Sequence, residues 1–147
     1  ALVDFFRERG FAVKLDTNGS RPTALPPLLP LLESVAMDVK CSLPRYPELT
    51  GWKDTEAIAE SVRLLKSWGR CEFRTTVIGP VHSDDDMHEI GRLLEGAPLY
   101  ALQPFIPRDN LPDPALRTVP ATPASRLAEL RDLMAGYVAR VVVRGTA

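Results

Sequence analysis

Polar side chains that could do chemistry are concentrated where two apolar runs near the start of the chain end. The first run ends in DTNGS at positions 16–20, and the second ends in MDVK at positions 37–40. Asp38 and Lys40 are two residues apart, so a carboxylate and an ammonium share one side of an extended chain. The residues alone leave two interpretations open, a functional site or a mutual or cross-strand ion pair. Asn18-Gly19 is also a common turn-forming pair.

A second polar group, His82 with the acidic run 84–86, has the residue types of a metal site. Helix capping explains it better, because Ser83 and the carboxylates would lie at a helix N-terminus, where negative charge is stabilised. His88 falls within the same helix, and we expect it on the solvated face.

Cys41 and Cys71 are thirty residues apart, with no cysteine or histidine at metal-ligand spacing beside either one. We interpret them as small packing residues in a reducing compartment, which predicts a cytoplasmic protein.

The composition excludes several classes of protein. With 147 residues, 45% hydrophobic and 25% charged, the chain predicts a single globular domain over 1–147. The net charge of −1 provides no basic stripe for nucleic acid. The longest apolar run, 25–32, contains three prolines and is too short to cross a membrane. The chain lacks an initiator methionine and begins in a helical pattern that ends at Gly10, so we expect that a segment precedes it.

The elements that must position the polar residues alternate between strands and helices. Strand patterns cover residues 11–16, 35–40, 71–77, 99–103 and 140–144. Three helices lie between them, and the following residues mark their ends. Asp54 caps the first helix, which ends at Gly69. Ser83 and Asp86 form a capping box for the second helix, which ends near Gly96. Thr122-Pro123 opens the third. Three prolines make a helix over 23–33 a weak expectation.

Each of the first four strands has one apolar face and one polar or less apolar face. The charged members of the second face are Lys14, Asp16, Asp38, Lys40, Glu72 and Arg74. One explanation is an antiparallel sheet with one face in water. The intervening helices favour parallel strands with outer helices, an α/β partial barrel whose inner face holds these charges. Six charges in a dry interior would be costly, so that face predicts a binding site.

Six segments, taken in order, resemble the activating proteins of anaerobic ribonucleotide reductase. They are VKLDTNGS (13–20), VAMDVK (35–40), RYPELTG (45–51), EFRTTV (72–77), LQPF (102–105) and VRG (143–145). Members of that family are radical S-adenosylmethionine enzymes with a partial (β/α) barrel of six units. They cleave S-adenosylmethionine reductively to a 5'-deoxyadenosyl radical, which abstracts hydrogen from a glycine of the partner enzyme.

The resemblance implies roles for individual residues. Asp16, Thr17 and Asp38 match positions that help to hold a monovalent cation, with the backbone carbonyl of Ala36. The cofactor-binding set that it implies for S-adenosylmethionine is Asn18, Asp38, Lys40, Arg74 and Gln103. For Arg74, a structural ion pair with Glu72 or Asp38 is the alternative.

The resemblance also has two gaps. The family's CxxxCxxC loop, which holds a 4Fe-4S cluster, and its Gly-Gly-Glu stretch are both absent, and Ile78-Gly79-Pro80 replaces the usual proline-glycine order. The two missing motifs belong to two βα units that would precede Ala1, so we expect an N-terminally truncated barrel that is inactive alone.

The resemblance implies a glycyl-radical enzyme as partner, anaerobic ribonucleoside-triphosphate reductase, with flavodoxin or ferredoxin as reductant. Two alternatives stay open, an activase or maturase for another glycyl-radical partner, and a non-catalytic cofactor-binding or interaction module.

Overall fold

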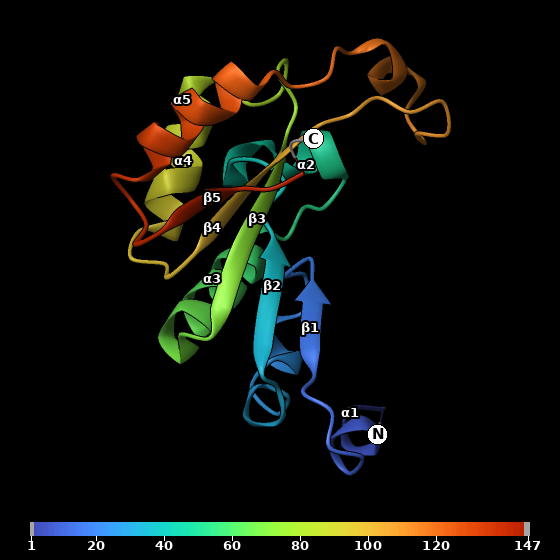
Figure 1. Cartoon of the computed structure of the whole chain (residues 1–147), viewed down its shortest axis with the longest axis vertical. Coiled ribbons are helices and arrows are strands. Elements are labelled where there is room, and N and C mark those ends of the chain that lie inside the picture. The colour runs from blue at the N-terminus through green and yellow to red at the C-terminus, as the bar shows by residue number, and fades with distance from the viewer. Residues whose placement is uncertain (1, 146–147) are drawn as a thin grey trace.

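A computed structural model describes residues 2–145 and contains a five-stranded, entirely parallel sheet in the order β1-β2-β3-β4-β5 (Figure 1). The strands are β1 Lys14–Thr17, β2 Ser34–Asp38, β3 Cys71–Val77, β4 Tyr100–Pro104 and β5 Val141–Val143. The α/β fold with parallel strands in chain order is therefore confirmed, and the antiparallel alternative is wrong. The last strand joins the same sheet as the others.

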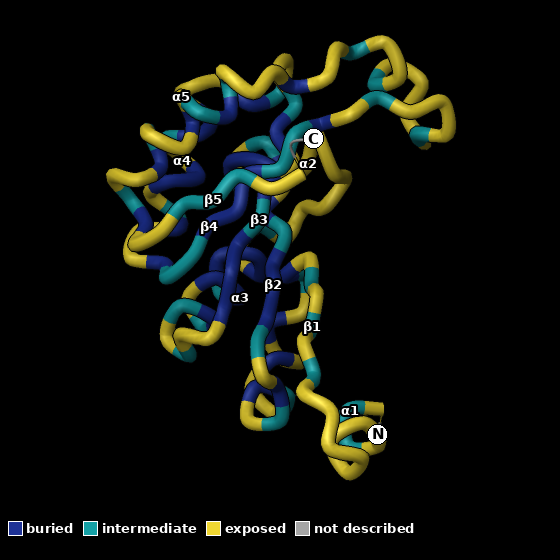
Figure 2. Tube along the Cα trace, viewed as in Figure 1, coloured by how far each residue is buried: buried dark blue, intermediate teal, exposed yellow. Residues whose placement is uncertain are grey.

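Three longer helices cover one face of this sheet. The α-helices are α1 Leu2–Arg7, α2 Tyr46–Thr50, α3 Thr55–Trp68, α4 Asp84–Leu94 and α5 Ala124–Met134. Ile58 of α3, Ile90 of α4 and Leu130 of α5 are buried with the apolar strand residues Phe73 and Leu102 in one core (Figure 2). Helices α3, α4 and α5 lie on the same side of the sheet in Figure 1, and among residues 2–145 no helix covers the opposite face of the strands.

The strand register places the predicted polar residues on that uncovered face. Asp38 pairs with Arg74, which pairs with Ala101, while Met37 pairs with Phe73 one position earlier. Because neighbouring residues in a parallel register share a face, the alternation predicted along single strands continues across the sheet. The site residues are therefore held on rigid extended chain.

The predicted side-chain caps of α3 and α4 are confirmed. The Asp54 carboxylate accepts the Ala57 N–H at 3.1 Å, and Gly69 ends α3 in a left-handed conformation. The Ser83 hydroxyl accepts the Asp86 N–H at 3.2 Å and caps α4.

Other expected elements differ from the structure. Helix α5 begins at Ala124 and has no side-chain cap, because the Thr122 hydroxyl is used elsewhere: it donates to Val77 O and accepts from Phe105 N. Helix α1 ends at Arg7, and β1 begins only at Lys14. The proline-rich stretch forms two single 3₁₀ turns, at Pro22–Ala24 and Leu29–Leu31, since proline interrupts an α-helix.

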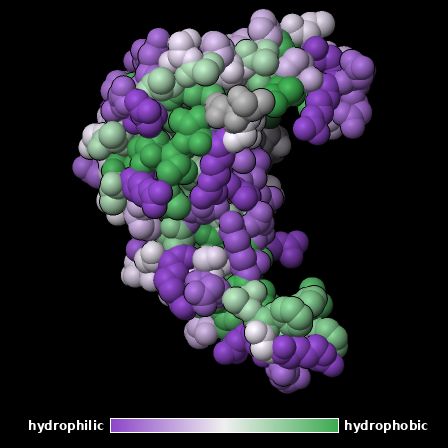
Figure 3. Space-filling view, viewed as in Figure 1, coloured by the Kyte–Doolittle hydropathy of each residue, from purple (hydrophilic) through white to green (hydrophobic). Residues whose placement is uncertain are grey.

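Helix α1 is the least embedded element. None of its residues is buried, and exposed apolar side chains gather there, including Phe5 and Phe6 of α1 and the nearby Phe11 (Figure 3). Within residues 2–145, no helix combines the length and hydrophobicity needed to cross a bilayer.

Gly19 is expected to tolerate alanine less well than Gly10 does. Both have positive φ, +75° and +81°, which costs an alanine about 1–2 kcal/mol. A Cβ at Gly19 would also lie 2.1 Å from Cε of the buried Met37, whereas a Cβ at Gly10 meets nothing within 4 Å. Urea denaturation should therefore show Gly19→Ala losing about 1–3 kcal/mol more than Gly10→Ala, the usual cost of overpacking. Equal losses would show that Met37 has room to move.

Candidate functional site

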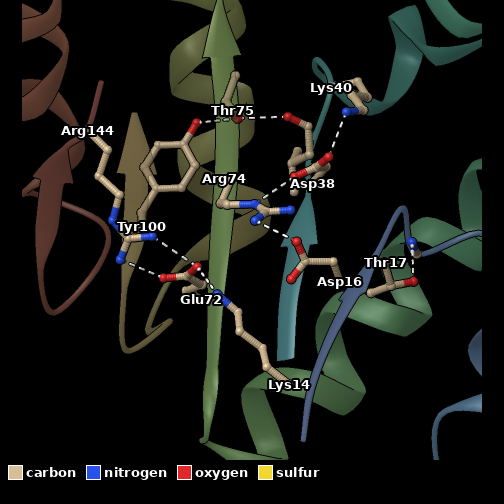
Figure 4. A network of polar contacts seen from close by, with 12 residues as sticks. Lys14, Asp16, Thr17, Asp38, Lys40, Glu72, Arg74, Thr75, Tyr100 and Arg144 are labelled. Atoms are coloured by element: carbon tan, nitrogen blue, oxygen red, sulfur yellow. Dashed lines mark hydrogen bonds and ion pairs between the residues drawn. The ribbon is translucent and has the colours of Figure 1, made fainter. Parts of the chain in front are cut away.

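Charged side chains on the uncovered face of the sheet form two groups (Figure 4). We call the first the central cluster, which consists of Asp16, Asp38, Lys40 and Arg74. We call the second the lateral cluster, which consists of Lys14, Glu72 and Arg144. Four cations and three carboxylates therefore share this face.

In the central cluster, Arg74 joins the carboxylates of two neighbouring strands. Its Nε donates to Asp38 Oδ1 at 2.8 Å, and its Nη1 donates to Asp16 Oδ2 at 3.0 Å. Lys40 Nζ donates to the other Asp38 oxygen at 2.8 Å. Burial raises the pKa of Asp38, but Lys40 and Arg74 outweigh it, so the net pKa is lowered. Asp38 is therefore an ionised carboxylate held between two cations.

In the lateral cluster, Glu72 is the central residue. Arg144 donates to its two oxygens at 3.0 and 2.8 Å, and Lys14 Nζ donates at 3.0 Å. The hydrogen bond from Arg144 is the main reason that the pKa of Glu72 is lowered. Sequence reasoning did not select Arg144, although its alternation with Val142 in the last strand places it on the polar face.

Two neighbouring cavities open beside the central cluster. One of about 520 Å³ is lined by the polar residues Asp16, Thr17, Asn18, Asp38 and Arg74. The other, of about 600 Å³, has both polar and apolar walls, which include Asn18, Lys40, Tyr46, Trp52 and Phe105.

The structure therefore brings together all but one of the predicted site residues. The exception is Gln103 of β4, which pairs with Thr76 of β3 but lines neither cavity. Thr17 and Asn18 also shape their own turn, since their side-chain oxygens accept the Gly19 and Ser20 N–H groups, each at 3.1 Å.

The two cysteines do not fit an iron–sulfur cluster. Both are buried, and burial raises the pKa of each thiol to about 11, which disfavours the thiolate that binds iron. Across residues 2–145, no group of three or more His, Cys, Asp or Glu is arranged to hold a metal ion. A monovalent cation at Asp16, Thr17 and Asp38 receives no support either, because these residues form no such group in that part of the chain.

The central cluster does fit the amino-acid part of S-adenosylmethionine. That part carries a carboxylate and an ammonium. Asp16, Asp38 and Arg74 line the polar cavity, and Lys40, which pairs with Asp38, lines the adjoining one. The cavity of about 600 Å³ adds apolar and aromatic surface next to it, which suits an adenosine group.

His82 and the acidic run take part in structural contacts. His82 is only 1% exposed, and its Nδ1 accepts the Ile78 N–H at 3.0 Å while Nε2 donates to Lys40 O at 3.0 Å. Asp86 accepts from Ser42 Oγ at 2.5 Å and pairs with Arg45. The capping interpretation holds for Ser83, but His82 and Asp86 also join two loops.

His88 was expected to be solvated, and this is only partly right. It is half-buried, and its Nδ1 forms a 2.8 Å hydrogen bond with Tyr137 Oη.

His82 predicts a pH dependence of stability. Burial lowers its pKa below the value of about 6.5 expected in the unfolded chain, so the unfolded state binds the proton more readily. Stability contributed by His82 is complete above that unfolded pKa and is lost as the pH falls below it. Asp86 nearby stays ionised in this window because its pKa is lowered.

Urea denaturation of wild type and His82→Gln between about pH 7.5 and 5 tests this dependence. The wild type should lose stability relative to the variant as the pH falls. A constant difference across the range would contradict a buried, neutral His82.

The chain was compared with known protein families, with curated proteins and with solved structures. None of the known family models matches the chain. It is 33% identical over 153 residues to a Methanocaldococcus jannaschii protein that is named, provisionally, as a glycyl-radical enzyme activating enzyme. The match covers 97% of this chain and 62% of the relative, so the chain spans less than two thirds of that protein.

The fold is similar to that of a solved domain of pyruvate-formate lyase-activating enzyme from Bacteroides vulgatus. The TM-score is 0.75 at 12% identity, and the match covers 98% of this chain and 89% of the solved one. At that identity the likeness concerns the fold alone.

Proposed function

We propose that the chain is part of a radical S-adenosylmethionine activating enzyme, because it is similar in sequence to a protein named as a glycyl-radical enzyme activating enzyme and in fold to a domain of pyruvate-formate lyase-activating enzyme. The observation that carries the proposal is the central cluster, in which Asp16 and Asp38, at the carboxyl ends of β1 and β2, pair with cations. In βα folds, that end of the sheet is where ligand sites are built.

In this proposal each residue of the central cluster binds one part of the ligand. Lys40 and Arg74 face its carboxylate, and Asp16 and Asp38 face its ammonium, each exchanging part of an existing ion pair for the ligand. Lys40 is more accessible to the ligand than Arg74, because the Lys40 side chain is 50% exposed and that of Arg74 is 17% exposed. When bound beside a reduced cluster, S-adenosylmethionine would supply the radical chemistry of the family.

The finer proposal is that the partner is anaerobic ribonucleoside-triphosphate reductase, with flavodoxin or ferredoxin as reductant in the cytoplasm. It is supported by the ordered set of segments that resemble that activase family. An activase for another glycyl-radical enzyme is the second candidate, and the name of the Methanocaldococcus relative is compatible with both. Whether the parent gene encodes a CxxxCxxC loop ahead of residue 1 discriminates an enzyme from a non-catalytic module, since the enzyme requires that loop.

Lys40→Ala tests the ligand-binding proposal. In the whole protein with its cluster reconstituted, calorimetry should show S-adenosylmethionine affinity falling by about 1.5–3 kcal/mol, which is about ten- to hundredfold, because a hydrogen bond to a charged group is lost. Lys53→Ala is the matched control, since Lys53 is an exposed lysine that lines neither cavity. Equal affinity for wild type and Lys40→Ala would remove Lys40 from the site.

A further inference from the structure

The main chain at Lys40 is held on both sides by buried side chains. Its N–H donates to Tyr46 Oη at 3.0 Å, and its carbonyl accepts from His82 Nε2 at 3.0 Å. The Ile78 N–H donates to the other ring nitrogen of His82, which places the imidazole proton on Nε2, where it points at Lys40. One neutral imidazole therefore joins the loop after β2 to the loop after β3.

The preceding residue is fixed in the same way. The Val39 N–H donates to Arg74 O at 2.8 Å, and the Val39 carbonyl accepts from Thr75 Oγ1 at 2.7 Å. Strand β2 ends at Asp38. Of the next four backbone groups, the N–H and C=O of Val39 and of Lys40, three are hydrogen-bonded to side chains instead of to a neighbouring strand. Lys40 leaves the sheet in a defined direction.

His82 is itself tightly held. It lies in the segment between β3 and α4, and Arg45 anchors this segment by donating to Val81 O and pairing with Asp86 in the first turn of α4. Lys40, Ile78 and Val81 all line the cavity of about 600 Å³, so the spacing that His82 sets between the two loops also sets the width of this cavity.

We infer that His82 is a positioning residue for S-adenosylmethionine binding, which acts by fixing the backbone at Lys40. The inference rests on the proposed function, because it gives His82 a role only through a ligand contact of Lys40. The imidazole touches no ligand in this arrangement. Its contribution is the fixed position from which the Lys40 ammonium reaches the central cluster.

Two substitutions separate the bonds that His82 makes. Glutamine places an N–H donor near the position of Nε2 and preserves the bond to Lys40 O, whereas asparagine places an acceptor near Nδ1 and does not reach Lys40. In the whole protein, His82→Asn should weaken S-adenosylmethionine binding about tenfold, and His82→Gln should stay within about threefold of wild type. A purely structural role would make the glutamine and asparagine variants equal in affinity.

A double-mutant cycle with Lys40→Ala completes the test. If His82 acts through Lys40, His82→Asn weakens binding in the wild-type background and has no further effect in the Lys40→Ala background. Equal weakening in both backgrounds overturns the inference, because His82 would then act independently of Lys40. Full affinity of His82→Asn beside a weakened Lys40→Ala overturns the inference and leaves the proposed function standing. Unchanged affinity of Lys40→Ala removes both.

If His82→Asn does not fold, His82→Ser replaces it in the cycle. That variant removes both ring nitrogens and cannot reach Lys40 O. It should weaken binding only when Lys40 is present, and an effect of equal size without Lys40 overturns the inference. Circular dichroism on each variant establishes folding before the titrations.

Discussion

The chain of 147 residues, purified alone and reconstituted anaerobically with iron and sulfide, is expected to form no 5'-deoxyadenosine from S-adenosylmethionine. Reductive cleavage needs an electron from a cluster held by closely spaced cysteine thiolates. Cys41 and Cys71 are the only cysteines, both are buried, and neither is favoured as a thiolate. The expected loss of activity is therefore complete.

Iron content, absorbance and a product assay on the same samples make this measurement. A radical S-adenosylmethionine enzyme that carries its own CxxxCxxC loop, reconstituted in parallel, is the positive control. A Cys41→Ala, Cys71→Ala double variant should retain as little iron as the unmodified chain. A stoichiometric four-iron cluster with product formation from the chain alone would overturn this part of the account.

Replacing Asp86 with alanine is expected to lower the free energy of unfolding by about 3 kcal/mol, the loss typical of breaking a buried ion pair. The Asp86 side chain is 9% exposed, accepts from Ser42 and pairs with Arg45. Its removal leaves the buried Ser42 hydroxyl without its acceptor and the partly buried Arg45 guanidinium without its carboxylate partner. The loops after β2 and β3 would lose a main connection.

Asp85→Ala is the matched control for this prediction. Asp85 lies in the same first turn of α4, where it is exposed, so it shares the favourable helix-terminal charge without the buried partners. Denaturant unfolding should show it within about 0.5 kcal/mol of wild type. Equal losses for the two variants would indicate that helix-terminal charge, and not the buried pair, is the source of the stability.

The alternating pattern of single strands predicted the polar face correctly. Asp38 and Lys40, and Glu72 and Arg74, were assigned to one face from a period of two. The parallel register keeps Asp38, Glu72 and Arg74 there, and Lys40, beyond the end of β2, reaches that face through its ion pair with Asp38. This works because the direction of a strand side chain depends on local geometry alone.

Contacts between loops could not be predicted in this way. The bonds from Tyr46 and His82 to Lys40 join residues 6 and 42 positions apart, through a histidine that looked like part of an acidic cap. Thr122 was assigned to a helix cap by its position before proline, but two strand ends use its hydroxyl. Such contacts depend on where loops meet in the folded chain, which periodicity does not encode.

Protection of lysines in the whole, unsubstituted protein tests the central claim most directly. Lys40 and Lys14 lie on the same face with side chains 50% and 47% exposed, so an amine-acetylating reagent should reach both at similar rates. With saturating S-adenosylmethionine, mass spectrometry should show acetylation slowed at Lys40 of the central cluster and unchanged at Lys14 of the lateral cluster and at Lys53. Unchanged acetylation of Lys40, or protection of Lys14 in its place, would contradict the assignment of the central cluster as the S-adenosylmethionine site.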